Sequence, residues 1–177
     1  MHLEQMAASE VGRIEEIDRS ERITEQYVVR NGELELIQAD IRAIGWGGPG
    51  DQGLKDQLSV WQAHLDKGAI LWGAFEGPSL LGAALVDPPG APLPSGVAYL
   101  ATLYVTDAAR GSGVGSALVK AVLQTAREQG ATDLYVSATP TRETVDFYLA
   151  QGFVRLATPN PRLLELEPDD IHLQRKL

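Results

Sequence analysis

Cysteine is absent from the 177 residues of this chain, and its absence excludes several kinds of chemistry at once. Without cysteine there is no disulfide framework, no thiolate ligand for a metal and no cysteine nucleophile. Histidine is also rare, and His2, His64 and His172 are too far apart in sequence to show the spacing of metal ligands. We therefore expect no metal site and no acyl group carried on a cysteine.

Basic residues are outnumbered by acidic ones. The chain has 15 Lys and Arg residues against 24 Asp and Glu residues, which gives a formal net charge of −9. A protein that holds nucleic acid needs a basic face to neutralise phosphates, so this balance argues against a nucleic-acid partner. A single anionic ligand held by backbone N–H groups is still compatible with the charge.

Long hydrophobic runs are missing as well. Residues 1–22 carry acids throughout and lack the apolar core of a signal peptide. No apolar stretch approaches the roughly 18 residues that a spanning helix needs. We therefore expect no membrane association and a cytoplasmic location. The length and the 44% hydrophobic content suit one globular domain over residues 1–177.

Hydrophobic periodicity predicts two hairpins and a helix in the first half of the chain. Asn31-Gly32 separates two strand-like runs and is typical of a tight hairpin turn. Residues 54–67 repeat apolar side chains at helical spacing, which predicts a helix. Two apolar runs on either side of residues 76–78 (Glu-Gly-Pro) predict a second hairpin.

The second half alternates strands and helices. The run VAYLATLYV at 97–105 is apolar nearly throughout, as expected for a strand buried on both faces. An amphipathic helix follows from residue 114 and is predicted to end at Gly130. A strand at 133–139 and a helix at 141–151 come next, and further strands are expected at 154–157 and 171–177. This order favours an α/β or α+β domain with a mixed sheet.

The segment RGSGVGS at 110–116 lies between the strand at 97–105 and the helix. Its three glycines remove side chains where the backbone must turn and approach a ligand closely. The free N–H groups and the dipole at the start of a helix attract anions. Arg110 can add a charge-assisted hydrogen bond. The segment is therefore a candidate cradle for a phosphate or pyrophosphate.

Two common phosphate-binding motifs do not fit this segment. A P-loop needs Lys after its last glycine, but Gly115 is followed by Ser116 and Ala117. A dinucleotide fingerprint needs its third glycine one position later and an acid after the next strand. A glycine-rich turn that only connects a strand to a helix is the alternative that these residues leave open.

RGSGVG at 110–115 resembles the Arg/Gln-x-x-Gly-x-Gly/Ala signature of the GNAT superfamily of N-acetyltransferases. TVDFYLAQGF at 144–153 resembles the second motif of the same family. The resemblance covers residues 70–156 well and the first 45 residues poorly. It implies a mixed, mostly antiparallel central sheet flanked by helices, the acyl-CoA N-acyltransferase fold.

The resemblance also implies a reaction, in which the acetyl group of acetyl-CoA passes to a primary amine by direct attack. It implies that the pyrophosphate lies on the N–H groups of 111–116, that the pantetheine arm runs along the strand at Leu103 and Val105, and that Tyr148 protonates the CoA thiolate. A core aromatic is the alternative reading of Tyr148. The implied cofactor-binding residues are Leu103, Val105, Arg110, Gly111, Ser112, Gly113, Val114, Gly115, Ser116 and Thr141.

This chain departs from the family pattern at two places. Thr141 stands where many relatives carry Asn, and it offers the cofactor a shorter partner. The strand at 97–105 has no acid, although many relatives carry a glutamate general base there. Glu76 and Asp51 are candidates by residue type only. The missing acid favours a second hypothesis, a non-catalytic module that binds acyl-CoA or a partner on the same fold.

The acceptor is expected to be a small-molecule or peptide amine, and the net negative charge favours a cationic one. Trp46 is the tryptophan best placed in sequence to line an acceptor pocket, because it lies in a glycine-rich loop. The acidic run at 15–22 is interpreted as a solvated face. Lys120, Arg127 and Arg142 are expected to be surface charges, with the CoA 3′-phosphate as the alternative ligand. A homodimer is left open.

Overall fold

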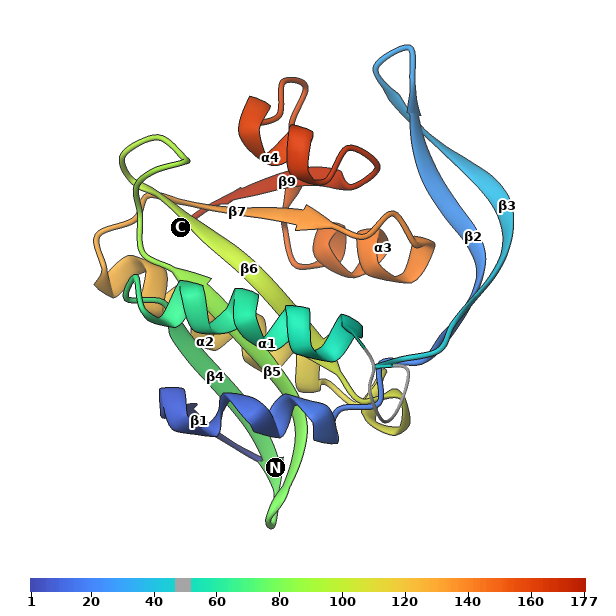
Figure 1. The fold of residues 1–177 in the computed structure, drawn as a ribbon. Coiled ribbons are helices and arrows are strands. Elements are labelled where there is room, and N and C mark those ends of the chain that lie inside the picture. Colours follow the sequence, from blue (N-terminus) through green and yellow to red (C-terminus); the bar gives the residue numbers. More distant parts are fainter. Residues whose placement is uncertain (47–51) are drawn as a thin grey trace.

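The computed structural model describes residues 1–46 and 52–177 (Figure 1). Its larger sheet has seven strands in the order β1-β4-β5-β6-β7-β9-β8. Neighbouring strands in this sheet are antiparallel, except that β6 and β7 are parallel. The expected mixed, mostly antiparallel sheet is therefore confirmed. The strands are β1 (His2–Met6), β4 (Ile70–Glu76), β5 (Ser79–Asp87), β6 (Val97–Val105), β7 (Asp133–Ala138), β8 (Val154–Arg155) and β9 (Ile171–Lys176).

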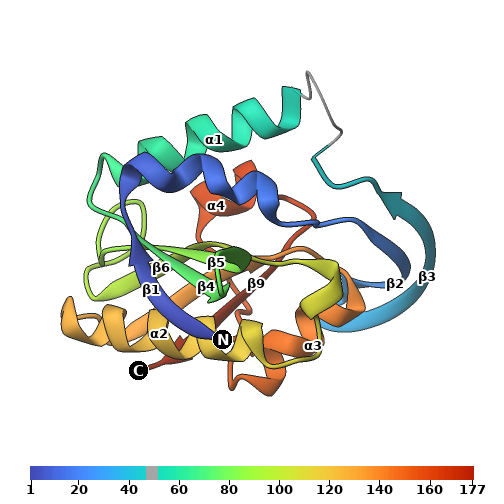
Figure 2. The same ribbon diagram turned by 90° about the horizontal axis from the view of Figure 1, so that it is seen from below.

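Helices cover both faces of this sheet (Figure 2). The 3₁₀ helix η1 (Ala8–Glu16) and α1 (Gln52–Leu65) lie on one face, and α2 (Val114–Glu128) and α3 (Arg142–Ala150) lie on the other. The short segments η2 (Asp107–Ala109) and α4 (Pro161–Leu166) complete the described helices. The sequence patterns predicted α1, α2 and α3 but not β1, η1 or α4. With five and six residues, β1 and α4 are too short to establish a clear hydrophobic period, and η1 is a 3₁₀ helix, whose three residues per turn differ from the α-helical period.

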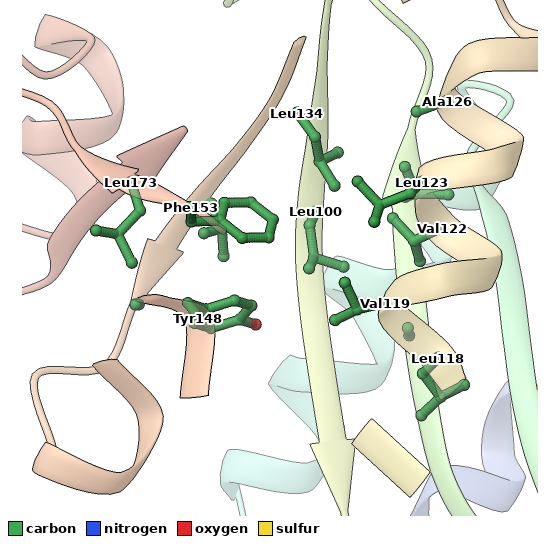
Figure 3. Close-up of a cluster of buried hydrophobic side chains, with 14 of the residues drawn as sticks. Leu100, Leu118, Val119, Val122, Leu123, Ala126, Leu134, Tyr148, Phe153 and Leu173 are labelled. Atoms are coloured by element: carbon green, nitrogen blue, oxygen red, sulfur yellow. The ribbon is translucent and has the colours of Figure 1, made fainter. Parts of the chain in front are cut away.

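The apolar stripe of α2 packs against the sheet, as its spacing predicted. Leu118, Val119 and Val122 are fully buried beside Leu100 of β6 and Leu134 of β7 (Figure 3). On the opposite face, Trp61 of α1 and two isoleucines of the N-terminal segment, Ile14 and Ile17, are fully buried against β4 and β5. The sheet is thus sandwiched between two apolar layers.

The predicted turns are confirmed by their backbone conformations. Asn31 and Gly32 have positive φ values of 52° and 80°, as a two-residue hairpin turn between antiparallel strands requires. At the end of α2, Gly130 has φ 82°, and the N–H of Ala131 donates to the carbonyl of Ala126. This bond closes the helix with a Schellman motif.

The first predicted hairpin forms a separate ribbon of β2 (Glu21–Arg30) and β3 (Glu33–Ala43). The ribbon curves past α3 (Figure 1). The N–H of Tyr27 donates to the carbonyl of Pro140 at 2.7 Å, and Gln26 forms an isolated bridge with Thr141. These contacts attach the ribbon to the segment that leads into α3.

Strands β6 and β7 pair over a short stretch only. Residues 97–99 pair with residues 133–135, and the two strands form no further pairs toward their carboxyl ends. The prediction that the whole strand at 97–105 is buried on both faces is therefore wrong. Its residues 97–100 are buried, whereas residues 101–105 are half-buried because they line the opening that the diverging strands leave.

Candidate active site

A cavity of about 620 Å³ occupies the opening between β6 and β7. Residues 100–105 of β6 and 136–138 of β7 form two of its walls. The start of α2, the helix α3, the ribbon strand β2 and the segment before β9 supply much of the rest, and Arg19, Ala43 and Gly45 also line the cavity. Segments that are distant in sequence therefore meet around one cavity.

The glycine-rich segment begins α2 at the edge of this cavity. Gly113 is the N-cap of α2 and has φ 93°, and Gly111 has φ 74°, conformations that favour glycine. No side chain caps the helix, so its first N–H groups keep their capacity to bind an anion. Nothing lies within 4 Å of the position that a Cβ of Gly113 would take. The predicted anion cradle therefore has unfilled space in front of its N–H groups at Gly113.

The residues predicted around the cradle do not all reach the cavity. Gly111, Gly113, Gly115, Ser116 and Arg110 line it.

Two of the predicted residues are directed elsewhere. The side chain of Val114 is only 2% exposed and belongs to the apolar core. Ser112 is exposed, and its hydroxyl donates to the carbonyl of Ala109 at 2.6 Å. Only their backbone groups are available to a ligand of the cradle.

Leu103 and Val105 line the cavity on the free edge of β6. The N–H of Thr106 donates to the carbonyl of Leu81 in β5. Backbone groups of successive residues in a strand alternate between its two edges, so those of Val105 and Leu103 are directed away from β5. An extended chain in the cavity could therefore pair with this edge as an added strand.

Tyr148 of α3 both packs in the core and lines the cavity. The residue is 4% exposed, and its ring meets Phe147 and Phe153 edge-on, with centroids 5.1 and 5.3 Å away. Its hydroxyl is directed toward β6 (Figure 3). Burial, followed by the nearby charge of other acidic groups, raises the pKa of Tyr148, so the phenol keeps its proton at neutral pH.

Thr141 lines the cavity but has a structural partner. It is the N-cap of α3, where its Oγ1 accepts from the N–H of Thr144 at 3.2 Å and donates to the Thr144 hydroxyl at 2.9 Å. Capping explains a threonine here without any contact to a cofactor.

The structure supplies the acids that the strand at 97–105 lacks. Four carboxyl groups from different parts of the sequence line the cavity, namely Glu21, Glu143, Glu167 and Asp170. Burial raises the pKa of Asp170 to about 6, with the charges of neighbouring acids adding to the effect. Burial also raises the pKa of Glu21.

Of the two acids chosen by residue type, the one within the described residues does not line the cavity. Glu76 is exposed at the end of β4 and does not line the cavity, and Asp51 lies outside the described residues. No shared local pattern marks the four acids that do, since they are spread over β2, α3 and the segment before β9. Two acidic stretches were available as hints, the run at 15–22 that contains Glu21 and the short stretch before the last strand that contains Glu167 and Asp170.

The N-terminal acidic run is more than a solvated face, which corrects the interpretation from sequence. Ile17 is fully buried, and Arg19 lines the cavity, where its Nη1 donates to the hydroxyl of Tyr104 at 3.3 Å. The guanidinium of Arg19 covers the ring of Trp46 at 4.2 Å. Trp46 itself is 9% exposed and donates through Nε1 to the carbonyl of Ile17, so it anchors the segment instead of lining the cavity.

The three basic residues considered for the CoA phosphate lie outside the cavity lining. Lys120 and Arg127 are exposed on α2. Arg142 pairs with Glu25 of β2 at 2.6 Å and with Asp146 at 3.4 Å.

Over residues 1–46 and 52–177 no group of three or more His, Asp or Glu side chains is arranged to hold a metal ion. Within the same ranges, every helix is too short or too polar to cross a membrane.

Residues 38–153 match the family model described as the acetyltransferase (GNAT) family. The chain belongs to this family. The resemblance predicted from the two motifs is therefore confirmed, and the match extends further toward the N-terminus than residues 70–156.

N-acetyltransferase 8B of Rattus norvegicus is 34% identical over 113 residues, which are 62% of this chain and 50% of that protein. N-acetyltransferase 8 of the same species is 35% identical over 102 residues, 55% of this chain and 46% of that protein. This GNAT chain thus spans about half the length of the curated relatives that it matches.

Solved structures share the fold over nearly the whole chain. A nourseothricin acetyltransferase has a TM-score of 0.72 with 19% identity, covering 99% of this chain and 97% of that one. A protein from Bacillus anthracis str. Ames, named for streptothricin acetylation and solved with acetyl coenzyme A, has a TM-score of 0.73 with 17% identity. That match covers 100% of this chain and 99% of the other. These likenesses confirm the predicted GNAT fold.

Proposed function

We propose that this protein is an N-acetyltransferase that moves the acetyl group of acetyl-CoA to a primary amine. The observation that carries the proposal is the opening between β6 and β7, with the uncapped, glycine-rich start of α2 at its edge. Family membership supports the same reaction.

The cavity residues suit acetyl-CoA in two ways. Backbone N–H groups of residues 111–116 would bind the pyrophosphate, with Arg110 beside them. The backbone groups of Leu103 and Val105 on the free edge of β6 would pair with the amide groups of the pantetheine arm, where the carbonyl of Val105 also accepts from Nε of Arg110 at 3.4 Å. When bound, acetyl-CoA supplies an activated thioester carbonyl. The protein would position that carbonyl, remove a proton from the amine and donate a proton to the leaving thiolate.

The acceptor is proposed to be a cationic amine. Four carboxyl groups line the cavity against two guanidinium groups, those of Arg19 and Arg110. Arg110 pairs with Asp107 at 3.4 Å and its charge also acts on Glu21, and Arg19 is engaged with Tyr104 and Trp46. The excess of acids in the lining would attract an ammonium group. The chain has no cysteine to carry an acyl group, so direct attack of the amine is proposed.

Tyr148 is proposed as the general acid. A buried phenol that is protonated at neutral pH can donate its proton to sulfur as the thiolate leaves. Its position, lining the cavity and directed toward β6, supports this role.

The proposal is tested by measuring CoA release over a panel of amines. The panel should include polyamines, aminoglycosides, amino acids and peptides with free N-termini. It should also include nourseothricin and streptothricin, since two structural neighbours are named for acetylating them. Release that depends on one amine class supports the proposal. Binding of acetyl-CoA without release for any amine would favour the alternative of a non-catalytic acyl-CoA-binding module. A cytoplasmic location and a single domain are further proposals that rest on the sequence.

A further inference from the structure

The segment between α4 and β9 places one acid in the cavity without a cationic partner. Asp170 lines the cavity and is half-buried. Within residues 1–46 and 52–177, no Lys, Arg or His forms an ion pair with it. The neighbouring acid Glu167 differs, because it accepts a hydrogen bond from the hydroxyl of Tyr99 at 3.4 Å. Of the two acids of this segment that line the cavity, Asp170 is therefore the one whose carboxylate is not engaged by Tyr99.

Buried hydrogen bonds hold this segment in position. Nε2 of His172, which is 3% exposed, lies 3.2 Å from the carbonyl oxygen of Glu167 and donates to it. The N–H of Asp170 donates to the same carbonyl at 3.3 Å. With Nε2 protonated, Nδ1 of His172 accepts from the hydroxyl of Tyr135 at 2.8 Å. That hydroxyl in turn accepts from the N–H of Asn160 at 3.2 Å. The segment is thus tied to β7 and β9.

The surroundings of Asp170 and Tyr148 favour an ionised carboxylate and a protonated phenol at neutral pH. Burial is the main cause that raises the pKa of the phenols on β6 and α3, and the charge of Asp170 adds only a minor contribution, so these phenols stay protonated. Burial and neighbouring acids raise the pKa of Asp170 itself to about 6. Arg19, at the hydroxyl of Tyr104, is the cation on the facing N-terminal segment. The charges of Glu167 and Asp169 on its own segment act on Asp170, and Asp170 in turn acts on Tyr99 and Tyr104 of β6 and on Tyr148 of α3. His172 lies two residues further along the chain, and the other charged groups that line the same cavity are Glu21, Glu143, Arg19 and Arg110.

We propose that Asp170 is the general base, whose carboxylate takes the proton that the acceptor ammonium group must lose before its nitrogen attacks. The inference rests on the proposed function. The ammonium first gives one proton to Asp170, which passes it to solvent. The nitrogen lone pair then forms the C–N bond as the C–S bond breaks, and the electron pair of that bond stays on sulfur. The thiolate takes a proton from Tyr148, and the second N–H proton of the attacking nitrogen restores the phenol. The amide product keeps one N–H.

The test compares Asp170→Asn with wild type over pH 5 to 10, with an acceptor that wild type acetylates. Loss of a general base lowers kcat/KM by about 10²–10⁴-fold at pH 7. The deficit shrinks as pH approaches the pKa of the acceptor amine, because that amine then arrives deprotonated. The limb of the wild-type profile near pH 6 disappears. Carbon-13 NMR of labelled Asp carboxyl groups gives a readout independent of activity, a titration near pH 6 that Asp170→Asn lacks.

Asp169→Asn is the matched control, since Asp169 is exposed on the same segment and does not line the cavity. It should keep wild-type kcat/KM at pH 7 and keep the acidic limb, moved slightly to lower pH because one of the charges that raise the pKa of Asp170 is removed. Asp170→Ser is a second variant in case Asn disturbs the segment, and the thermal shift with acetyl-CoA verifies that each variant is folded. An Asp170→Asn protein within threefold of wild type at every pH overturns the inference alone. A wild-type protein that binds acetyl-CoA but acetylates no amine overturns the proposed function, and the base with it.

Discussion

At the scale of single residues, Tyr148 shows how one side chain can serve packing and chemistry together. Its ring packs beside Phe147 and Phe153, the residue also lines the cavity, and its hydroxyl is directed toward β6 (Figure 3). The core reading and the catalytic reading made from sequence are therefore compatible. They differ in what the hydroxyl alone contributes, and a substitution that removes only the hydroxyl separates them.

Replacing Tyr148 with Phe should lower kcat by about 10²–10⁴-fold, because it removes the proton donor for the thiolate. The affinity for acetyl-CoA should change little, since the lost interaction belongs to the transition state. The melting temperature should also stay close to wild type, because the ring still packs. Turnover, acetyl-CoA affinity and melting temperature are measured on one acceptor.

Tyr148→Ala is the matched comparison. Removing an aromatic ring from a core costs about 3–5 kcal/mol, so this variant should lose stability as well as turnover. A Phe variant with wild-type turnover would show that the hydroxyl has no part in the mechanism. Tyr148 would then be a core residue only.

Asp170 is also predicted to reduce stability at neutral pH. Its folded-state pKa of about 6 lies above the value of 3.8 for an unperturbed Asp, so between these values the folded protein binds more protons than the unfolded one. The protonated Asp170 side chain therefore stabilises the fold at low pH, and this contribution to the free energy of unfolding is lost as pH rises from about 4 to about 6. Asn cannot ionise, so Asp170→Asn should melt progressively higher than wild type from pH 4 to pH 6, with a constant difference above that.

The measurement is the difference in melting temperature between the two proteins at each pH. His172 and the other titratable groups occur in both, so to first order their contributions cancel. A difference that does not vary between pH 4 and pH 7 would mean that the pKa of Asp170 is not raised. If Asp170→Asn is more stable but less active than wild type, Asp170 serves the function of the protein and lowers its stability.

At the scale of elements, the start of α2 is the part of the site that sequence could predict. Three glycines between an apolar strand and an amphipathic helix are a local signal, and the structure has the expected uncapped helix start with Gly113 at φ 93°. Helix and hairpin positions were predictable for the same reason. Asn31-Gly32 and Gly130 fix their turns through their own backbone preferences.

The acidic side of the cavity could not be predicted in this way. Glu21, Glu143, Glu167 and Asp170 are spread along the chain, and only the fold brings them together. The divergence of β6 and β7 was equally hidden, because an apolar run looks the same whether both of its edges are paired or one is free. Arg19 was interpreted as solvated for the same reason, since its aromatic partners are distant in sequence.

Gly113→Ala should weaken acetyl-CoA binding by on the order of tenfold, about 1.4 kcal/mol. A Cβ at positive φ costs about 1–2 kcal/mol, and relief of that strain would turn the first N–H groups of α2 away from the cavity. Affinity is measured by calorimetry and stability by thermal melting. The prediction concerns binding beyond the loss of stability, so a control with equal strain is needed.

Gly130→Ala provides that control at the other end of the same helix. Gly130 has φ 82°, and as at Gly113 no atom lies within 4 Å of the position that a Cβ would take, but Gly130 does not line the cavity. Both variants should lose similar stability, and only Gly113→Ala should lose affinity. Equal affinities would show that the glycines of 111–115 merely make a turn.

At the scale of the whole molecule, the opening between β6 and β7 leaves the larger sheet incompletely paired. Each side of the opening is held by its own helices and neighbouring strands, α2 and β5 on one side and α3 and β9 on the other (Figure 1). A ligand that pairs with the free edge of β6 and binds the start of α2 would therefore add to the three β6–β7 residue pairs and the shared core that now join the two parts of the sheet.

Acetyl-CoA is accordingly expected to stabilise the fold and to protect specific amides. A ligand at a hundredfold excess over its dissociation constant adds about 2.7 kcal/mol, which raises the melting temperature of a chain this long by about 5–10 °C. Hydrogen exchange should slow at residues 111–116 and at Leu103 and Val105, because their N–H groups gain partners. Amides of the β2–β3 turn at Asn31 and Gly32 lie outside the cavity lining and serve as an internal control.

A melting temperature unchanged by millimolar acetyl-CoA would contradict the proposed cofactor. A normal thermal shift with protection at 111–116 but none at Leu103 or Val105 would instead contradict only the added-strand placement of the pantetheine arm.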